Sequence, residues 1–125
     1  MAKILILLPL LVACTGTNDA FGPPPAPQTE YSAVGQEPGW ALRFDRDRIN
    51  YTGDYGETRI TVARPLPVAT PSGRRYATSR LVVDIVPGAC RDAMSGSGFE
   101  DTVIVTAGGR TVRGCGGNRL PEDGF

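Results

Sequence analysis

The residues of this chain best suited to chemistry are two carboxylates, Glu37 and Asp92, and the hydroxyl of Ser95. A serine nucleophile needs a neighbouring base, and a carboxylate pair can act as acid and base if the fold brings the groups together. The chain has no histidine, and its single lysine is Lys3. The sequence therefore lacks the commonest general base and the commonest metal ligand. We expect a protein that is not an enzyme and that binds no metal or other cofactor.

The same polar residues also fit a structural interpretation, which we favour. Glu37 precedes Pro38 and the strand-opening Trp40, so its carboxylate would accept backbone N–H groups at a corner while the indole covers the core. Asp92 opens a segment typical of a tight turn, in which the aspartate caps its own backbone. The other residues of that turn motif are Met94, Ser95 and Gly96. Both carboxylates would then hold loops in place.

The N-terminal segment has the features of a bacterial lipoprotein signal. Residues 1–3 carry one positive charge, and residues 4–12 form an apolar run too short to span a bilayer as a helix. The sequence Leu-Val-Ala-Cys ending at Cys14 resembles the lipobox, where lipoprotein signal peptidase cleaves before a cysteine that carries diacylglycerol. The alternative is an ordinary signal peptide with a chance cysteine. Two or three acyl chains hold a protein firmly, because each buried methylene contributes about 0.8 kcal/mol.

The sequence divides into three segments. Residues 1–13 form the signal peptide, residues 14–30 the lipidated cysteine with a Pro-rich tether, and residues 31–125 one small β domain. The run Gly-Pro-Pro-Pro-Ala-Pro at 22–27 favours extended, polyproline-like chain. Thr15 stands where an aspartate retains lipoproteins of enteric bacteria in the inner membrane. We therefore expect a lipid-anchored protein of the cell envelope, on the periplasmic face of the outer membrane.

The composition argues against nucleic-acid binding. The 13 basic and 13 acidic residues leave no net charge, so no positive surface is expected to attract phosphates. Aromatic residues make up only 7% of the chain, too few for a base-stacking surface.

Apolar and polar residues alternate from Tyr31 onward, a pattern typical of half-buried strands. The polar residues 45–48 predict a turn, Pro-Gly at 87–88 ends a strand, and Gly-Gly at 108–109 predicts a tight hairpin. The expected strands contain residues 40–44, 49–51, 60–62, 76–78, 81–85, 102–107 and 110–115. No segment shows a 3.6-residue period of helical length. We predict an all-β fold, a small antiparallel barrel or sandwich of six to eight short strands.

Two cysteines remain once Cys14 is lipidated, and an exported domain favours a disulfide between Cys90 and Cys115. Closing a loop of about 25 residues stabilises by roughly 3 kcal/mol in the chain-entropy model. A reactive or metal-binding thiol pair is the alternative, but the chain offers neither C-x-x-C nor histidine. A two-residue hairpin turn would place Cys115 opposite Thr102, away from the core. Either the bond lies at the rim, or Gly114 marks a bulge that redirects the cysteine.

Three segments of the chain stand out: Gly-Gln-Glu-Pro-Gly-Trp at 35–40, Cys-Arg-Asp-Ala-Met-Ser-Gly at 90–96 and Arg-Gly-Cys-Gly at 113–116. Together they resemble a family of uncharacterised proteobacterial lipoproteins and periplasmic domains, some found beside a META domain. The family pattern is G-x-E-P-x-W, then C-x-D-x-M-S-G, then a closing G-C, and the resemblance covers roughly residues 31–117. Gly39 stands where a bulkier residue is expected. The resemblance implies an envelope location and a compact β domain, and it brings no established activity. The matching positions are Gly35, Glu37, Pro38, Trp40, Cys90, Asp92, Met94, Ser95, Gly96, Gly114 and Cys115.

A fourth segment, Ser-Gly-Arg-Arg-Tyr, is similar to the S-G-x-[KR]-Y loop of membrane-bound inhibitors of c-type lysozyme. The resemblance implies that Ser72 and Arg75 enter the lysozyme cleft and meet its catalytic carboxylates. Arg74 is then expected to point to solvent. The alternative is an ordinary turn flanked by solvated arginines, and the cysteine positions differ from those of the inhibitors. The matching positions are Ser72, Gly73, Arg75 and Tyr76.

The leading hypothesis is a non-enzymatic, lipid-anchored envelope protein with a binding or structural role. Its expected partners are the membrane, through the anchor, and an envelope protein. The alternative is an inhibitor of c-type lysozyme that acts through the loop at residues 72–76.

Overall fold

The structure, a computed structural model, describes residues 29–122. The predicted signal peptide, the lipidation site Cys14 and nearly all of the tether lie outside the described residues. Within residues 29–122, no helix is long and apolar enough to cross a membrane.

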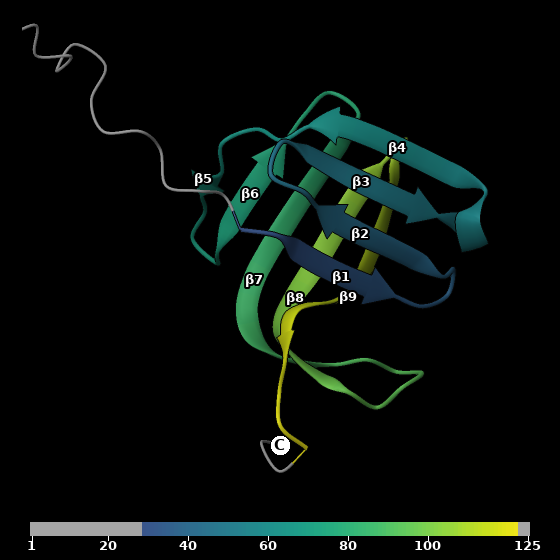
Figure 1. The fold of residues 1–125 in the computed structure, drawn as a ribbon, viewed down its shortest axis with the longest axis vertical. Coiled ribbons are helices and arrows are strands. Elements are labelled where there is room, and N and C mark those ends of the chain that lie inside the picture. Colours follow the sequence, from purple (N-terminus) through teal and green to yellow (C-terminus); the bar gives the residue numbers. More distant parts are fainter. Residues whose placement is uncertain (1–28, 123–125) are drawn as a thin grey trace, which may run out of the picture.

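The described chain folds into one antiparallel sheet that curls into a half-barrel (Figure 1). The strand order is β4-β3-β2-β1-β9-β8-β7-β6-β5, and the 3₁₀ turn η2 (Asp54–Gly56) joins β3 to β4. The prediction of a small all-β antiparallel fold is confirmed, with nine strands in residues 29–122 where six to eight were expected. The strands are β1 (Tyr31–Gly35), β2 (Trp40–Phe44), β3 (Arg48–Gly53), β4 (Thr58–Ala63), β5 (Val68–Ala69), β6 (Arg74–Ala77), β7 (Leu81–Arg91), β8 (Gly98–Ala107) and β9 (Arg110–Arg119).

The core lies inside the curl, between two halves of the sheet that face each other. The ring centroids of Phe44 on β2 and Tyr76 on β6 are 4.8 Å apart, although four strands separate β2 from β6 in the sheet. Contact across that separation requires the sheet to curl. The alternating apolar residues of each strand supply the inward side chains, as the sequence pattern predicts. The fully buried ones are Leu42, Phe44, Ile49, Leu81, Val83, Ile85, Val103 and Val105.

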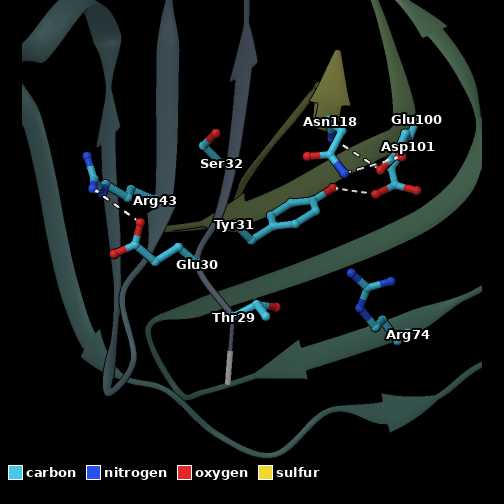
Figure 2. A pocket seen from close by; sticks show the side chains of 10 residues that line it. Thr29, Glu30, Tyr31, Ser32, Arg43, Arg74, Glu100, Asp101 and Asn118 are labelled. Carbon is cyan, nitrogen blue, oxygen red and sulfur yellow. Dashed lines mark hydrogen bonds and ion pairs between the residues drawn. The ribbon is translucent and has the colours of Figure 1, made fainter. Parts of the chain in front are cut away.

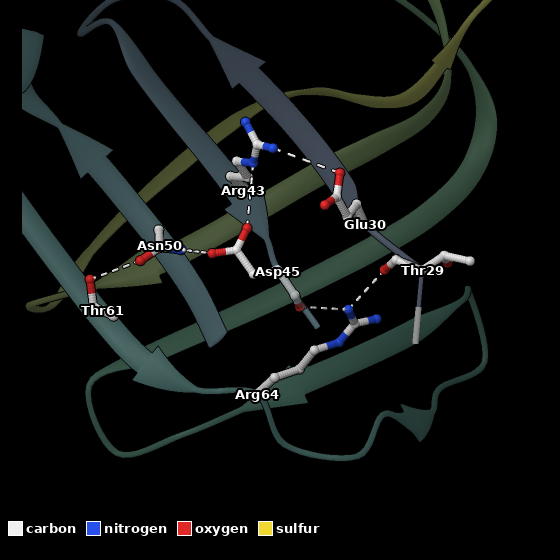
Figure 3. A network of polar contacts seen from close by, with 7 residues as sticks. All are labelled: Thr29, Glu30, Arg43, Asp45, Asn50, Thr61 and Arg64. Carbon is white, nitrogen blue, oxygen red and sulfur yellow. Dashed lines mark hydrogen bonds and ion pairs between the residues drawn. The ribbon is translucent and has the colours of Figure 1, made fainter. Parts of the chain in front are cut away.

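The link between β4 and β5 shows how far the curl goes. Residues 64–67 join the two outermost strands of the sheet, and a link of this length spans at most about 18 Å. Arg64 in this link lies over the rings of Phe44 and Tyr76, 5.0 and 5.7 Å from their centroids. Its Nη1 also donates to the backbone oxygens of Thr29 and Asp45, at 2.8 and 3.0 Å (Figure 3). Arg64 therefore closes one end of the half-barrel and holds the point where the chain enters it.

The two predicted hairpin turns are confirmed. Residues 45–47 connect β2 to β3, and Asp45 accepts a hydrogen bond from Asn50 Nδ2 at 3.0 Å (Figure 3). Gly108 and Gly109 connect β8 to β9 with φ of 58° and 77°. This left-handed backbone favours glycine.

Several strand boundaries differ from the expectation. Strand β7 does not stop at residues 87–88 but continues to Arg91, with a bulge between Pro87 and Cys90. A bulge accommodates a residue without an N–H inside a strand, which explains why proline did not end it. Strand β6 begins at Arg74, two residues before the predicted Tyr76.

The Cys90–Cys115 disulfide is formed, as predicted. It joins β7 to β9, which are separated in the sheet by β8. Cys115 does lie opposite Thr102, and Gly114 keeps the regular register, so the second of the two alternatives, a bulge at Gly114, is not formed. The β7 bulge before Cys90 redirects that strand instead. A disulfide of this kind is typical of a protein outside the cytoplasm.

Candidate functional site

The three motif segments meet at one corner of the half-barrel, which we call the motif corner. Gly35 on β1 pairs with Gly114 on β9, and the indole of Trp40 packs against both. A Cβ on Gly35 would lie 1.9 Å from Trp40 Nε1, and one on Gly114 would lie 2.0 Å from the Val34 carbonyl oxygen. Only glycine fits either position. The motif corner comprises Gly35, Glu37, Pro38, Trp40, Cys90, Asp92, Gly114 and Cys115.

Glu37 does not act as the sequence predicted. It is exposed, with φ of 56°, and its carboxylate accepts no hydrogen bond from any residue between 29 and 122. The expected contacts with backbone N–H groups are therefore not formed. Nor is it the partner of Asp92, whose carboxylate bonds to Ser95 and Gln36. The structure thus gives no support to the pairing of Glu37 with Asp92 as acid and base.

Asp92 caps its turn as predicted. Its Oδ2 accepts hydrogen bonds from the backbone N and the hydroxyl of Ser95 at 2.9 and 2.7 Å, and its backbone oxygen accepts one from Gly96 N at 2.9 Å. These bonds from Ser95 lower the pKa of the Asp92 carboxyl below its usual value. A carboxylate with a lowered pKa is a poor general base at neutral pH. Met94, in the same turn, is 73% exposed.

Replacing Asp92 should cost stability in a pH-dependent way. Because the pKa is lowered by folding, the contribution is present above the unfolded value of about 3.9 and is lost as the pH falls through the folded-state pKa. We expect Asp92→Asn to lower the free energy of unfolding by about 1 kcal/mol at pH 7. Urea unfolding at several pH values should show the difference shrinking below about pH 4. A difference that stays constant with pH would contradict this role.

The segment resembling the lysozyme-inhibitor loop is only partly a loop. Ser72 is exposed in the turn between β5 and β6, whereas Tyr76 lies in β6 and is buried. A Cβ on Gly73 would lie 2.0 Å from a backbone oxygen of β7, so only glycine fits there. Arg75 forms a two-point ion pair with Asp84 on β7, Nε to Oδ1 at 2.6 Å and Nη2 to Oδ2 at 3.2 Å.

Arg74 does not point to solvent, which corrects the sequence expectation. It is half-buried, and its guanidinium lies over the ring of Tyr31, 5.6 Å from the centroid. Positions alternate along a strand, so Arg74 and Arg75 face opposite sides of β6. Arg74 therefore faces the inside of the curl, where a cleft opens beside β1.

This opening, which we call the N-terminal cleft, has a volume of about 690 Å³ (Figure 2). It lies where the chain enters the half-barrel, and five strands contribute side chains to it. Its lining residues are Thr29, Glu30, Tyr31, Ser32, Arg43, Arg74, Glu100, Asp101, Gly117 and Asn118.

Tyr31 and Asp101 form the centre of the N-terminal cleft. The Tyr31 hydroxyl donates to Asp101 Oδ2 at 2.8 Å, and Asp101 is only 8% exposed (Figure 2). Burial, together with the Asp101 carboxylate, raises the pKa of the Tyr31 phenol well above its usual value. The phenol is therefore a hydrogen-bond donor throughout the physiological pH range. Asp101 receives no ion pair from the residues that the structure describes.

The remaining charges are arranged on either side of Tyr31. Glu100 accepts hydrogen bonds from the backbone N and Nδ2 of Asn118, at 3.2 and 3.4 Å (Figure 2). On the other side, Arg43 makes long ion pairs with Glu30 and Asp45, at 3.7 and 3.5 Å. The lining of the N-terminal cleft therefore carries both charges: Glu30, Glu100 and Asp101 are acidic, and Arg43 and Arg74 are basic.

The sequence did not predict this cleft, although one signal pointed to it. Asp101 continues the inward alternation of Val105 and Val103, so a charged residue stands at a core-facing position. A buried carboxylate is costly unless it is satisfied, which makes such a position a candidate for function.

Neither known proteins nor a metal-binding arrangement of side chains indicates what this domain does. No protein family, curated protein or solved structure matches the chain. Between residues 29 and 122, no group of three or more metal-ligating side chains is close enough to hold an ion.

Proposed function

We propose that the chain is a lipid-anchored protein of the bacterial cell envelope, whose β domain has a non-enzymatic binding role. The observation that carries the proposal is the Cys90–Cys115 disulfide, because such bonds form and persist in oxidising compartments outside the cytoplasm. The lipobox that ends at Cys14 supplies the anchor, and Thr15 favours the periplasmic face of the outer membrane. The N-terminal cleft offers a polar opening for the ligand.

The proposal predicts that Cys14→Ala abolishes lipidation. The apolar run and the lipobox meet at Cys14, so without this thiol neither acylation nor cleavage by lipoprotein signal peptidase should occur. Cells fed labelled palmitate should show no label in the variant, and the precursor should keep its signal peptide.

The matched control is Cys90→Ala with Cys115→Ala, which removes the other two cysteines. This double variant should be labelled and processed like the natural chain. Normal processing and membrane association of Cys14→Ala would contradict the lipoprotein proposal.

Inhibition of c-type lysozyme is the second candidate function. The exposed position of Ser72 at the tip of its turn favours it. For Arg75 to meet a lysozyme carboxylate, its ion pair with Asp84 must open, at a cost that the inhibitor complex has to repay. The test is lysozyme inhibition by the full chain and by Arg75→Ala. A loss of inhibition specific to Arg75→Ala would favour this function, and no inhibition at micromolar protein would remove it.

A further inference from the structure

We propose that the N-terminal cleft binds a zwitterionic ligand, one that carries both an ammonium group and a carboxylate, as an amino acid or a short peptide does. The inference rests on the proposed binding role and names the ligand class for it. Lipid anchoring does not depend on it, so the two claims can fail separately.

Asp101 and Glu100 provide a site for the ammonium group. Asp101 is buried, and the only hydrogen bond that its carboxylate receives from residues 29–122 comes from the Tyr31 hydroxyl. Tyr31 satisfies one lone pair without neutralising the charge. Glu100 precedes Asp101 in β8 and lines the same cleft. A ligand ammonium would form charge-assisted hydrogen bonds with these carboxylates.

Arg74 provides a site for the carboxylate. Arg74 lies over the Tyr31 ring and makes no ion pair with any residue between 29 and 122. Its neighbour Arg75, by contrast, forms a two-point ion pair with Asp84. Figure 2 shows the Arg74 guanidinium and the Asp101 carboxylate in the same cleft, with no dashed line joining them. A guanidinium with free donors binds a carboxylate at two points.

The mixture of charges selects against simpler ligands. A phosphate or another anion attracted by Arg74 would be repelled by Glu100 and Asp101. A bare cation attracted by the two carboxylates would be repelled by Arg74. A ligand that carries both charges meets a partner for each of them. A volume of about 690 Å³ is ample for an amino acid or a dipeptide.

The ligand is tested by calorimetric titration of the full mature chain in detergent with dialanine. Two blocked forms are compared with it, N-acetyl-dialanine without the ammonium and dialanine amide without the carboxylate. We expect dialanine to bind, and each blocked form to bind about tenfold or more weakly. The L,L and D,D forms of dialanine are titrated separately. The L,L form represents peptides derived from proteins, and the D,D form represents peptides of the cell wall. Preference for either form supports the proposal and identifies the source.

Two cleft variants assign each charge to its partner. Arg74→Gln should weaken dialanine binding about tenfold, and amidation of the dialanine carboxylate should then weaken binding no further. Asp101→Asn keeps an acceptor for the Tyr31 hydroxyl, and in this variant N-acetylation of dialanine should no longer weaken binding. Arg75→Gln is the matched control and should bind dialanine like the natural chain, and thermal unfolding of each variant verifies that it is folded.

Three results would overturn the inference. The first is no heat of binding for natural chain with either dialanine form at millimolar concentration. The second is equal binding of blocked and unblocked forms. The third is an equal loss in Arg74→Gln and Arg75→Gln. If lipidation at Cys14 is nevertheless found, the proposal of a lipid-anchored envelope protein is retained, and only the proposal of a zwitterionic ligand is rejected.

Discussion

Gly114→Ala should lower the free energy of unfolding by about 3 kcal/mol or more, or prevent folding. The added Cβ would lie 2.0 Å from the Val34 carbonyl oxygen and 2.7 Å from Trp40 Cζ2. The first contact is with backbone in a neighbouring strand, so it can be relieved only by separating β1 from β9. That separation would break the pairing of Gly35 with Gly114 and loosen the indole packed over both.

Urea unfolding measures this cost, and Gly39→Ala is the matched control. At Gly39 a new Cβ would lie 3.1 Å from the ring of Tyr55, which is 77% exposed and can move aside. The control should therefore lose less than about 1 kcal/mol. Equal stability of the two alanine variants would contradict the conclusion that the motif corner requires glycine at position 114.

Removing the disulfide is the second change with a large expected effect. Cys90→Ala with Cys115→Ala should lower the free energy of unfolding by about 2–5 kcal/mol, because the crosslink closes a loop of 25 residues in the unfolded chain. In the folded state it also ties β7 to β9, which share no ladder of hydrogen bonds. Small domains depend on such crosslinks because their cores are small.

Reductant provides the control for this second prediction. It should destabilise the natural chain by the same amount and leave the double alanine variant unchanged. Mass spectrometry of the non-reduced chain should find the Cys90 and Cys115 peptides linked. Two free thiols in the exported protein, or no effect of reductant on unfolding, would contradict the account.

Features that depend on residues near one another in the sequence were predicted correctly. The alternation of Trp40, Leu42 and Phe44 with polar neighbours predicts β2, because a strand with one buried face has a period of two. Gly108-Gly109 predicts its hairpin, because the turn itself needs positive φ. The disulfide was predictable from an even cysteine count in an exported chain.

Features that depend on distant partners were missed. Pro87 signals the end of a strand, but pairing with β8 carries β7 past it through a bulge. The sequence suggests that Arg74 is a solvated charge, but the curl of the sheet places its guanidinium over the Tyr31 ring. Tyr31 and Asp101 are 70 residues apart in sequence, so no local pattern could join them into a cleft. The motif segments were found from the sequence, but their role in packing Gly35 and Gly114 under Trp40 required the register.

The position of the cleft is consistent with a tethered binding domain. Thr29 and Glu30 line the cleft, and Arg64 holds the Thr29 carbonyl oxygen at 2.8 Å (Figure 3). The described part of the chain therefore begins at the cleft, and the proposed lipid-anchored tether would join the domain beside the proposed ligand site.

Lipidation at Cys14 can be measured by intact-mass spectrometry of the protein extracted from membranes. The proposed lipoprotein should begin at Cys14 and carry the added mass of a diacylglyceryl group, with one further acyl chain where the host supplies it. It should also have two hydrogens fewer than the reduced form because of the disulfide. A chain that retains residues 1–13, or one that begins at another residue without lipid, would contradict the proposal.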